Sequence, residues 1–246
     1  MRLDKFLSQT GFGSRKEAKA LLKKKVVAVN GELAKEGKQS IDVERDRVSV
    51  QGEVVIYQEY YYYMLNKPQG VISATEDQSQ RTVLDLFKRE DYRMDLFPVG
   101  RLDKDTVGLL LITNDGALAH ELLSPKKHVD KTYIAKIEGK VTNNDVQIFA
   151  RGMQLTNQEH CLPAQLTILN SEHLPETQTL ISLVIQEGKF HQVKRMFEAV
   201  NKKVVALKRT KMGPLQLDET LKKGQYRSLT NHEVALLKEH QTRKNE

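Results

Sequence analysis

A charged loop that leads into an apolar run places the strongest constraint on how this chain can fold. Residues 107–112 are Val-Gly-Leu-Leu-Leu-Ile, and the turn signal Asn-Asp-Gly follows at 114–116. A short apolar run bounded by a turn predicts a strand buried on both faces. The preceding loop, residues 101–105, is Arg-Leu-Asp-Lys-Asp. A carboxylate at the mouth of a buried strand can be held rigidly and partly desolvated, as a nucleophile or general base requires. Residue types alone also allow these charges to pair with one another.

The rest of the sequence predicts more strands than helices. Apolar and alternating runs indicate strands near residues 60–65, 132–138, 163–169, 179–186 and 203–208. Helical periodicity indicates helices over residues 117–123, 142–151 and 189–200 and from Thr230 onward. Because strands and helices do not alternate strictly, we expect an α+β fold with a mixed, mainly antiparallel β-sheet flanked by helices. This larger domain is expected to span residues 58–241, ahead of a flexible tail at 242–246.

Residues 1–57 are predicted to form a separate small domain. Apolar residues at helical spacing indicate a first helix close to the N-terminus. Ser14 and Glu17 form a capping-box pattern, which predicts a second helix over residues 14–25. The pair Asn30-Gly31 between apolar residues predicts a β-hairpin. The expected domain is therefore a helix pair followed by short strands.

Basic residues are concentrated in two stretches. Lys and Arg number 39 against 32 Asp and Glu, which gives a formal charge of +7. Residues 1–25 contain eight basic and two acidic residues, and so do residues 187–211. The start of the second helix also offers free N–H groups and a positive dipole end that suit a phosphate. A solvated helix face would explain the first stretch alone, but two basic stretches, one per domain, fit one extended RNA ligand better.

Several classes of protein are disfavoured by the composition. The single cysteine, Cys161, cannot form an intrachain disulfide, which fits a reducing, cytoplasmic compartment. No segment approaches the roughly 18 apolar residues of a membrane span. The seven histidines show no metal-binding spacing, and no nucleotide-binding motif occurs. We therefore expect a cytoplasmic monomer that uses neither a metal nor a cofactor.

Three stretches of the first domain together resemble the S4 RNA-binding domain. They are residues 2–7 (Arg-Leu-Asp-Lys-Phe-Leu), 14–18 (Ser-Arg-Lys-Glu-Ala) and 27–31, where Val27, Val29 and Asn30-Gly31 fit the pattern. The resemblance implies an α-L-like fold whose two helices and hairpin present a basic surface to structured RNA. It assigns RNA binding to five basic residues, namely Arg2, Lys5, Arg15, Lys16 and Lys19.

Four motifs of the larger domain resemble those of the pseudouridine synthases that modify bacterial ribosomal RNA and carry an S4 domain. In order, they are residues 65–70 (Leu-Asn-Lys-Pro-Gln-Gly), 100–103 (Gly-Arg-Leu-Asp), 131–133 (Lys-Thr-Tyr) and 187–197 (Glu-Gly-Lys-Phe-His-Gln-Val-Lys-Arg-Met-Phe). The resemblance implies isomerisation of uridine. The bond from C1′ to N1 breaks, the uracil turns in the site, and C5 joins C1′, so no group donor or redox partner is needed.

The resemblance also implies roles for three residues. Asp103 is the essential carboxylate, which either attacks C1′ or removes the C2′ proton; the sequence leaves both routes open. Tyr133 is expected to stack on the flipped uracil or to form a hydrogen bond with it. Arg101 is expected to bind a phosphate or to fill the space that the uridine leaves.

The helix predicted over residues 189–200 suggests on which side of it each polar side chain lies. Lys194 lies at the edge of the apolar stripe and can point inward, where it would pair with Asp103 and keep that carboxylate ionised. Many members of the family have Arg at this place, and Lys makes a point-charge contact instead of a bidentate one. His191 and Arg195 lie one turn apart on the far side, where we expect them to face RNA or solvent.

The form Lys-Phe-His-Gln-Val-Lys-Arg at residues 189–195 most resembles the RsuA type of the family, which acts at one uridine of small-subunit (16S) ribosomal RNA. Two alternatives stay open: an enzyme of the same family that acts on large-subunit (23S) RNA, and a non-catalytic RNA-binding protein of ribosome assembly. A carboxylate glycosidase fits poorly, because no second acid is clearly placed and the basic stretches stay unexplained.

Overall fold

The computed structural model describes residues 1–155, 158–170 and 174–243, and these divide into two compact units. The first unit contains Met1–Tyr61 and also Phe87–Phe97, and the second contains Tyr62–Leu86 and Pro98–Glu246. With the expected domain boundary between residues 57 and 58, the whole of 87–97 belonged to the larger domain. The structure places this segment with the first unit, because its chain leaves the large sheet and packs beside the N-terminal helices, where Arg93 lies over the ring of Tyr61.

The first unit is a helix pair on a small antiparallel sheet. Its elements are α1 (Leu3–Gln9), α2 (Arg15–Lys23), β1 (Val27–Val29), β2 (Glu32–Leu33), β3 (Val48–Val50) and β4 (Glu53–Val54), with sheet order β2-β1-β3-β4. The predicted capping box is confirmed, since the Ser14 hydroxyl accepts from Glu17 N and the Glu17 carboxylate accepts from Ser14 N. A core of apolar side chains from both layers joins them, including Leu3, Phe6, Leu7, Ala18, Leu22, Val27 and Val48.

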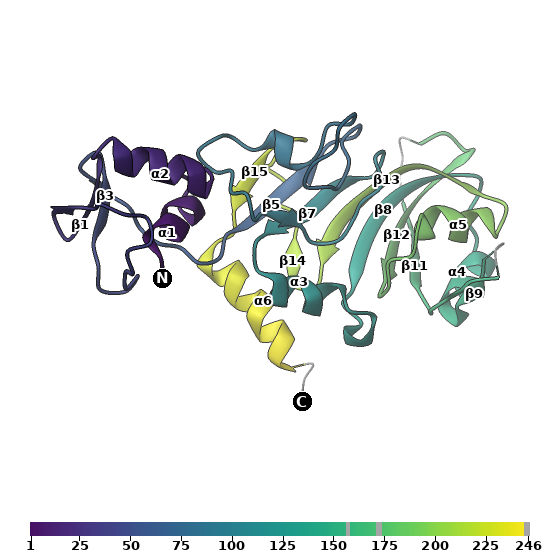
Figure 1. Ribbon diagram of the computed structural model, residues 1–246. Helices are drawn as coiled ribbons and strands as arrows, with labels where there is room; N and C mark the ends of the chain where they lie inside the picture. Colours follow the sequence, from purple (N-terminus) through teal and green to yellow (C-terminus); the bar gives the residue numbers. More distant parts are fainter. Residues whose placement is uncertain (156–157, 171–173, 244–246) are drawn as a thin grey trace. The chain divides into compact units, whose positions relative to one another are not determined.

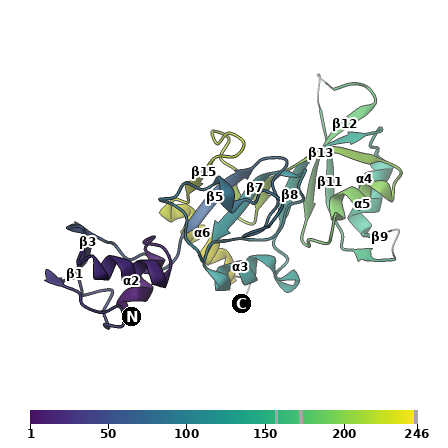
Figure 2. The same ribbon diagram turned by 45° about the horizontal axis from the view of Figure 1, so that its top comes forward.

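The second unit is built on one large sheet (Figures 1 and 2). Its main strands follow the spatial order β11 (Gln165–Leu169), β12 (Gln178–Ile185), β8 (Lys131–Glu138), β13 (Lys203–Met212), β7 (Val107–Thr113), β5 (Tyr62–Lys67) and β15 (Tyr226–Ser228). Within the described residues, β13 runs parallel to β7, and the other neighbours along this path are antiparallel. The expected α+β class with a mixed, mainly antiparallel sheet is confirmed.

Helices lie against both halves of this sheet. They are α3 (Gly116–Leu123), α4 (Asn143–Arg151), α5 (Gln192–Glu198), α6 (Asn231–Arg243) and the short 3₁₀ turns η1 (Leu84–Leu86) and η2 (Pro125–Lys127). In both views α4 and α5 lie beside β11, β12 and β13, whereas α3 and α6 lie near β5 and β7 (Figures 1 and 2). In the described part of the chain, no helix has the length and apolar character needed to cross a membrane.

Several predicted bounds differ from the structure. The helix expected over 189–200 is confined to α5. The tail was expected from 242, but α6 continues to Arg243, and residues 244–246 lie outside the described part. Short strands that the sequence did not suggest also occur, namely β6 (Phe97–Pro98), β9 (Met153–Gln154), β10 (His160–Cys161), β14 (Leu215–Gln216) and β15. Strands of two or three residues are too short to show a periodicity from which they could be predicted.

The central position of β7 confirms the prediction of a strand buried on both faces. The side chains of residues 109–112 have no exposed surface, and β5 and β13 flank the strand on its two edges. Gly108 pairs with Arg209 of β13. Its φ is +103°, and a Cβ atom there would lie 2.2 Å from the carbonyl oxygen of Arg209. No other residue type fits this place without moving one of the two strands.

We therefore expect Gly108→Ala to destabilise the protein by about 3 kcal/mol, from the left-handed backbone and the clash with β13 together. Gly224→Ala is the matched control, because Gly224 has a φ of +84° but a Cβ atom there would meet only Pro68 Cγ, at an ordinary contact distance of 3.9 Å. Its cost should be about 1 kcal/mol. Urea unfolding of the two variants measures both values, and equal losses would show that the close approach of the strands has no influence.

Candidate active site

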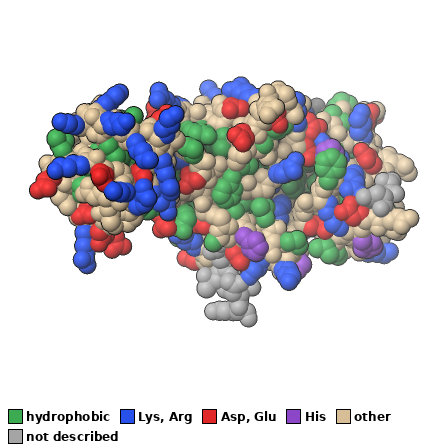
Figure 3. Space-filling model, in the orientation of Figure 1, with side chains coloured by type: hydrophobic (Ala, Val, Ile, Leu, Met, Phe, Trp, Pro, Cys, Tyr) green, Lys and Arg blue, Asp and Glu red, His purple; other side chains and the backbone are tan. Residues whose placement is uncertain are grey.

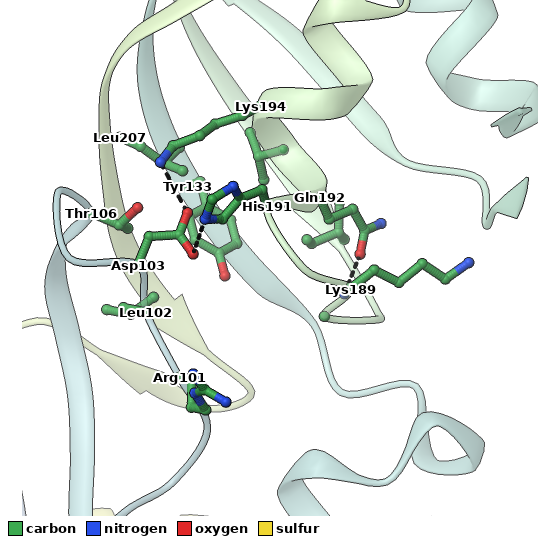
Figure 4. Close-up of a pocket in the computed structure, with 13 residues that line it drawn as sticks. Arg101, Leu102, Asp103, Thr106, Tyr133, Lys189, His191, Gln192, Lys194 and Leu207 are labelled. Atoms are coloured by element: carbon green, nitrogen blue, oxygen red, sulfur yellow. Dashed lines mark hydrogen bonds and ion pairs between the residues drawn. The ribbon is translucent and has the colours of Figure 1, made fainter. Parts of the chain in front are cut away.

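The charged loop before β7 and the segment before α5 form the two sides of one pocket. Arg101, Leu102, Asp103 and Thr106 line it from the loop, and Gly188, Lys189, His191, Gln192, Val193 and Lys194 line it from the other side. Tyr133 of β8, Ile185 of β12 and Leu207 of β13 contribute further walls. Figure 4 shows the Asp103 carboxylate turned toward Lys194 and His191. All three predicted catalytic residues, Asp103, Tyr133 and Lys194, therefore line one pocket.

Lys194 lies between two carboxylates. Its Nζ atom is 3.1 Å from Asp103 Oδ2, as the sequence predicted, and 2.7 Å from Asp105 Oδ1. Partial burial by itself lowers the pKa of Lys194, but the hydrogen bonds to Asp105 and Asp103 outweigh it and raise the pKa above its ordinary value. Burial likewise opposes ionisation of Asp105, yet the contact with Lys194 keeps the pKa of that carboxyl below its usual range. Lys194 is thus firmly charged.

His191 corrects the helical geometry expected for this segment. Its backbone is left-handed, with φ 50° and ψ 30°, and it precedes α5 instead of lying within it. The prediction that His191 faces away from the carboxylate was therefore wrong. Its Nε2 atom lies 3.7 Å from Asp103 Oδ1, and its ring lines the pocket. A helical wheel gives the wrong direction for a residue that is not in the helix.

Arg195 lies outside the pocket. Its guanidinium is 2.8 Å from the Glu159 carboxylate and donates to the carbonyl of Phe190, and its side chain is only 16% exposed. The prediction that this side chain faces RNA or solvent was wrong, because an acidic partner on the β9–β10 hairpin holds it. Arg101, in contrast, is exposed at the edge of the pocket.

A buried lysine anchors the loop that carries Asp103. Lys67, at the end of β5, has no exposed surface, and its ammonium donates to the carbonyls of Pro68, Asp103, Lys104 and Thr106 at 2.9–3.3 Å. Burial lowers its pKa to about 8, although the charges of Asp105 and Asp103 act in the opposite direction. Three of these four acceptors belong to residues 103–106. The ammonium therefore fixes the backbone from which the Asp103 carboxylate projects.

Two further contacts hold the same loop. Gly70 N donates to Lys104 O at 2.8 Å, and the Ser73 hydroxyl donates to Leu102 O while accepting from Leu102 N. The sequence had indicated residues 65–70 as a motif without giving Lys67 a function. The available signal was a lysine that directly continues an apolar strand, where an unpaired ammonium would be costly.

The opposite side of the pocket is fixed by a buried polar pair. Gln192 is 4% exposed; its Nε2 donates to Glu187 Oε1 at 2.7 Å, and its Oε1 accepts from Lys189 N at 2.9 Å. Glu187 also accepts from Leu162 N. These bonds close residues 187–192 into a compact turn, which leaves His191 and Lys194 pointing toward Asp103.

The cations predicted to bind RNA in the first unit are all exposed. Arg2 and Lys19 line a shallow basic pocket together with three residues that the sequence did not single out, Lys23, Lys35 and Lys38. Lys5, Arg15 and Lys16 are exposed elsewhere on α1 and α2. Arg2 is partly engaged, since its guanidinium contacts Asp4 at 2.7 Å. Figure 3 shows Lys and Arg side chains gathered over this unit.

Two family models match the sequence. The model described as RNA pseudouridylate synthase matches residues 61–199, and the model of the S4 domain matches residues 1–48. The chain belongs to the RNA pseudouridylate synthase family. Both resemblances noted in the sequence are thereby confirmed, and so is the expectation that the chain is an enzyme of the pseudouridine synthase class.

Relatives are similar along the whole chain. The uncharacterized RNA pseudouridine synthase YtzG of Bacillus subtilis (strain 168) is 48% identical over 241 residues, which cover 98% of this chain and 100% of that protein. The ribosomal small subunit pseudouridine synthase A of Escherichia coli (strain K12) is 40% identical over 237 residues, which cover 96% and 99%. A crystal structure of a pseudouridylate synthase aligns with a TM-score of 0.66 at 38% identity, covering 96% of this chain and 99% of that one.

Removing the anchor of the catalytic loop should impair both stability and rate. We expect Lys67→Met to destabilise the protein by about 3 kcal/mol, because the variant leaves buried carbonyls without a donor. The rate of pseudouridine formation should fall roughly 100-fold, since displacing a reacting group by about 1 Å has an effect of that size. Urea unfolding and single-turnover kinetics measure the two effects. Lys126→Met, at an exposed lysine of the same unit, should change neither.

The lowered pKa of Lys67 predicts how the activity depends on pH. With a pKa of about 8, against the ordinary 10.5, Lys67 loses its proton earlier in the folded protein than in the unfolded chain. Between these values the unfolded chain binds more protons, so linkage favours folding as pH rises, while the loop loses one donor. We expect kcat/KM to fall as pH rises through about 8, and this decline to be absent from Lys67→Met. An identical decline in that variant would assign it to another group.

Proposed function

We propose that this enzyme converts a uridine of small-subunit ribosomal RNA into pseudouridine, with Asp103 as the reacting carboxylate. One observation carries the proposal: Asp103, Lys194 and Tyr133, from three distant parts of the chain, line the same pocket. The choice of RNA is supported by the name of a relative, the ribosomal small subunit pseudouridine synthase A of Escherichia coli, which matches along the full chain.

The side chains around Asp103 suit a reaction that begins from an ionised carboxylate. Attack at C1′ and removal of the C2′ proton both require Asp103 without its proton. Lys194, 3.1 Å away, stabilises that form and stays charged itself. Ile185 and Leu207 form apolar walls that exclude water from the reacting atoms. Tyr133, 7% exposed, can stack on the uracil or form a hydrogen bond with it while it turns.

Basic residues of both units bind the RNA. Arg101 and His191 contact the RNA at the pocket, and the exposed cations Arg2, Lys5, Arg15, Lys16 and Lys19 of the first unit bind phosphates of structured RNA. Arg195, which the sequence also suggested, acts on RNA only indirectly, by holding the turn before α5 through Phe190 O. The enzyme works as a monomer in the cytoplasm and needs no cofactor.

Mapping pseudouridines in ribosomal RNA from a strain that lacks this protein tests the proposal. We expect one site of 16S RNA to stay uridine, and the wild-type gene to restore it. Asp103→Asn should fail to restore it, and the purified variant should bind RNA normally but release no tritium from C5-labelled uridine. Asp130→Asn is the matched control, since Asp130 is an exposed carboxylate of the same unit that accepts from Gln186, as an Asn could.

Each competing function has a distinct outcome in this experiment. Loss of a 23S site would identify large-subunit ribosomal RNA as the substrate. A wild-type protein that binds RNA but forms no pseudouridine would be the non-catalytic assembly protein. Full turnover by Asp103→Asn would refute the role of this carboxylate while leaving the substrate assignment in place.

Binding should also depend steeply on salt. With about five phosphate contacts, RNA affinity should fall roughly 100-fold between about 50 and 200 mM salt. Replacing Lys19, Lys35 and Lys38 by Gln should flatten the dependence, because these lysines share the basic pocket of the first unit. Fluorescence titration of 16S RNA measures the slope. The same slope in the triple variant would show that these lysines do not contact phosphate.

A further inference from the structure

Phe190 is an exposed aromatic residue beside the catalytic pocket. Its side chain is 75% exposed, and its chain neighbours, Lys189 and His191, both line the pocket. A single exposed phenylalanine is ordinary on a protein surface. The position of this one is not ordinary, because it lies in the turn that also presents His191 to Asp103.

The Phe190 ring is stacked on the imidazole of His191. The ring centroids are 3.8 Å apart and the planes differ by 19°. On its other side, His191 places Nε2 at 3.7 Å from Asp103 Oδ1 (Figure 4). The two rings therefore form a short stack that begins at the catalytic carboxylate. One face of Phe190 is covered by the imidazole, which leaves the opposite face as the main source of its exposed surface.

The backbone holds this stack in place. The carbonyl of Phe190 accepts from Arg195 Nη1 at 3.0 Å, and Lys189 N donates to the buried Gln192 amide. His191 is fixed in its left-handed conformation between them. A flat apolar surface next to a reacting group, already ordered before any ligand binds, suits a planar partner.

We propose that the outer face of Phe190 stacks on a nucleobase adjacent to the target uridine, and so positions the RNA strand while that uridine occupies the pocket. The inference rests on the proposed function. Unstacked bases of single-stranded RNA bind to aromatic side chains through their faces, and every base offers such a face. The exposed Arg101 at the same pocket supplies a cation for the phosphates of this strand. Phe190 is a positioning residue, since it does not contact the reacting atoms.

The kinetics of four variants test the inference on transcribed 16S RNA. Phe190→Ala and Phe190→Leu should raise KM roughly 5- to 100-fold, the range for losing one base–aromatic stack, and leave kcat within about threefold. Leucine keeps most of the apolar volume but has no aromatic face. Phe190→Tyr and Phe190→Trp should keep KM near the wild-type value. Wild-type KM in Phe190→Ala, or a leucine variant as good as phenylalanine, would overturn the inference.

A change in kcat alone would overturn it as well, because it would show that Phe190 acts only by holding His191. The direct test uses an RNA fragment around the mapped uridine, with an abasic ribose on either side in turn. At the stacked position, the abasic RNA should raise KM for the wild type as much as Phe190→Ala does, and combining both changes should add nothing. Additive effects at both positions would exclude stacking.

The outcomes also separate this inference from the proposed function. A wild-type enzyme that forms no pseudouridine in 16S RNA would refute both the proposed function and the stacking role of Phe190. A wild-type enzyme that is active, with all four variants indistinguishable from it, would remove only the stacking role of Phe190.

Discussion

The geometry of the active site depends on one buried ammonium. Lys67 lies at the end of β5 and donates to carbonyls of the loop that carries Asp103, so that strand and loop move as one body. An ammonium without partners would be costly at a site with no exposed surface, and the carbonyl dipoles offset that cost. The negative charges of Asp103 and Asp105 favour the ammonium further. The loop and the lysine thus stabilise each other, and the carboxylate is oriented before RNA arrives.

The sheet explains why the other side chains of the pocket come together around Asp103. β7 follows the loop directly, and β13 pairs with it in parallel, at a distance that only Gly108 permits. β13 also pairs with β8, which aligns Arg209 with Tyr133 and brings Leu207 to the pocket wall. α5 packs near β13 and supplies Lys194. Order along the sheet, and not order along the chain, determines which residues meet.

The sequence predicted those features that depend on local pattern or on a single family motif. The buried strand at 107–112, the capping box at Ser14 and the contact of Lys194 with Asp103 are of this kind. The bonds that join Lys67 to the loop of Asp103 could not be predicted, because these three acceptors lie 36 to 39 positions away in the chain. His191 was placed wrongly, since one left-handed residue shifts the start of α5 and thereby reverses the direction of the side chain.

Lys194 faces two carboxylates, and that arrangement has consequences for how RNA binds. One positive charge lies between Asp103 and Asp105, so these three side chains together are not basic. Such a centre stabilises an ionised Asp103 but attracts no phosphate. The cations available to phosphates lie elsewhere, among them the exposed Arg101 and the exposed lysines of the first unit, and uncharged surfaces near the pocket can contribute as well. The phenyl ring of Phe190, stacked on His191 beside Asp103, is such an uncharged surface, and the stacking proposed for it would bind a base without placing a further charge next to the carboxylate.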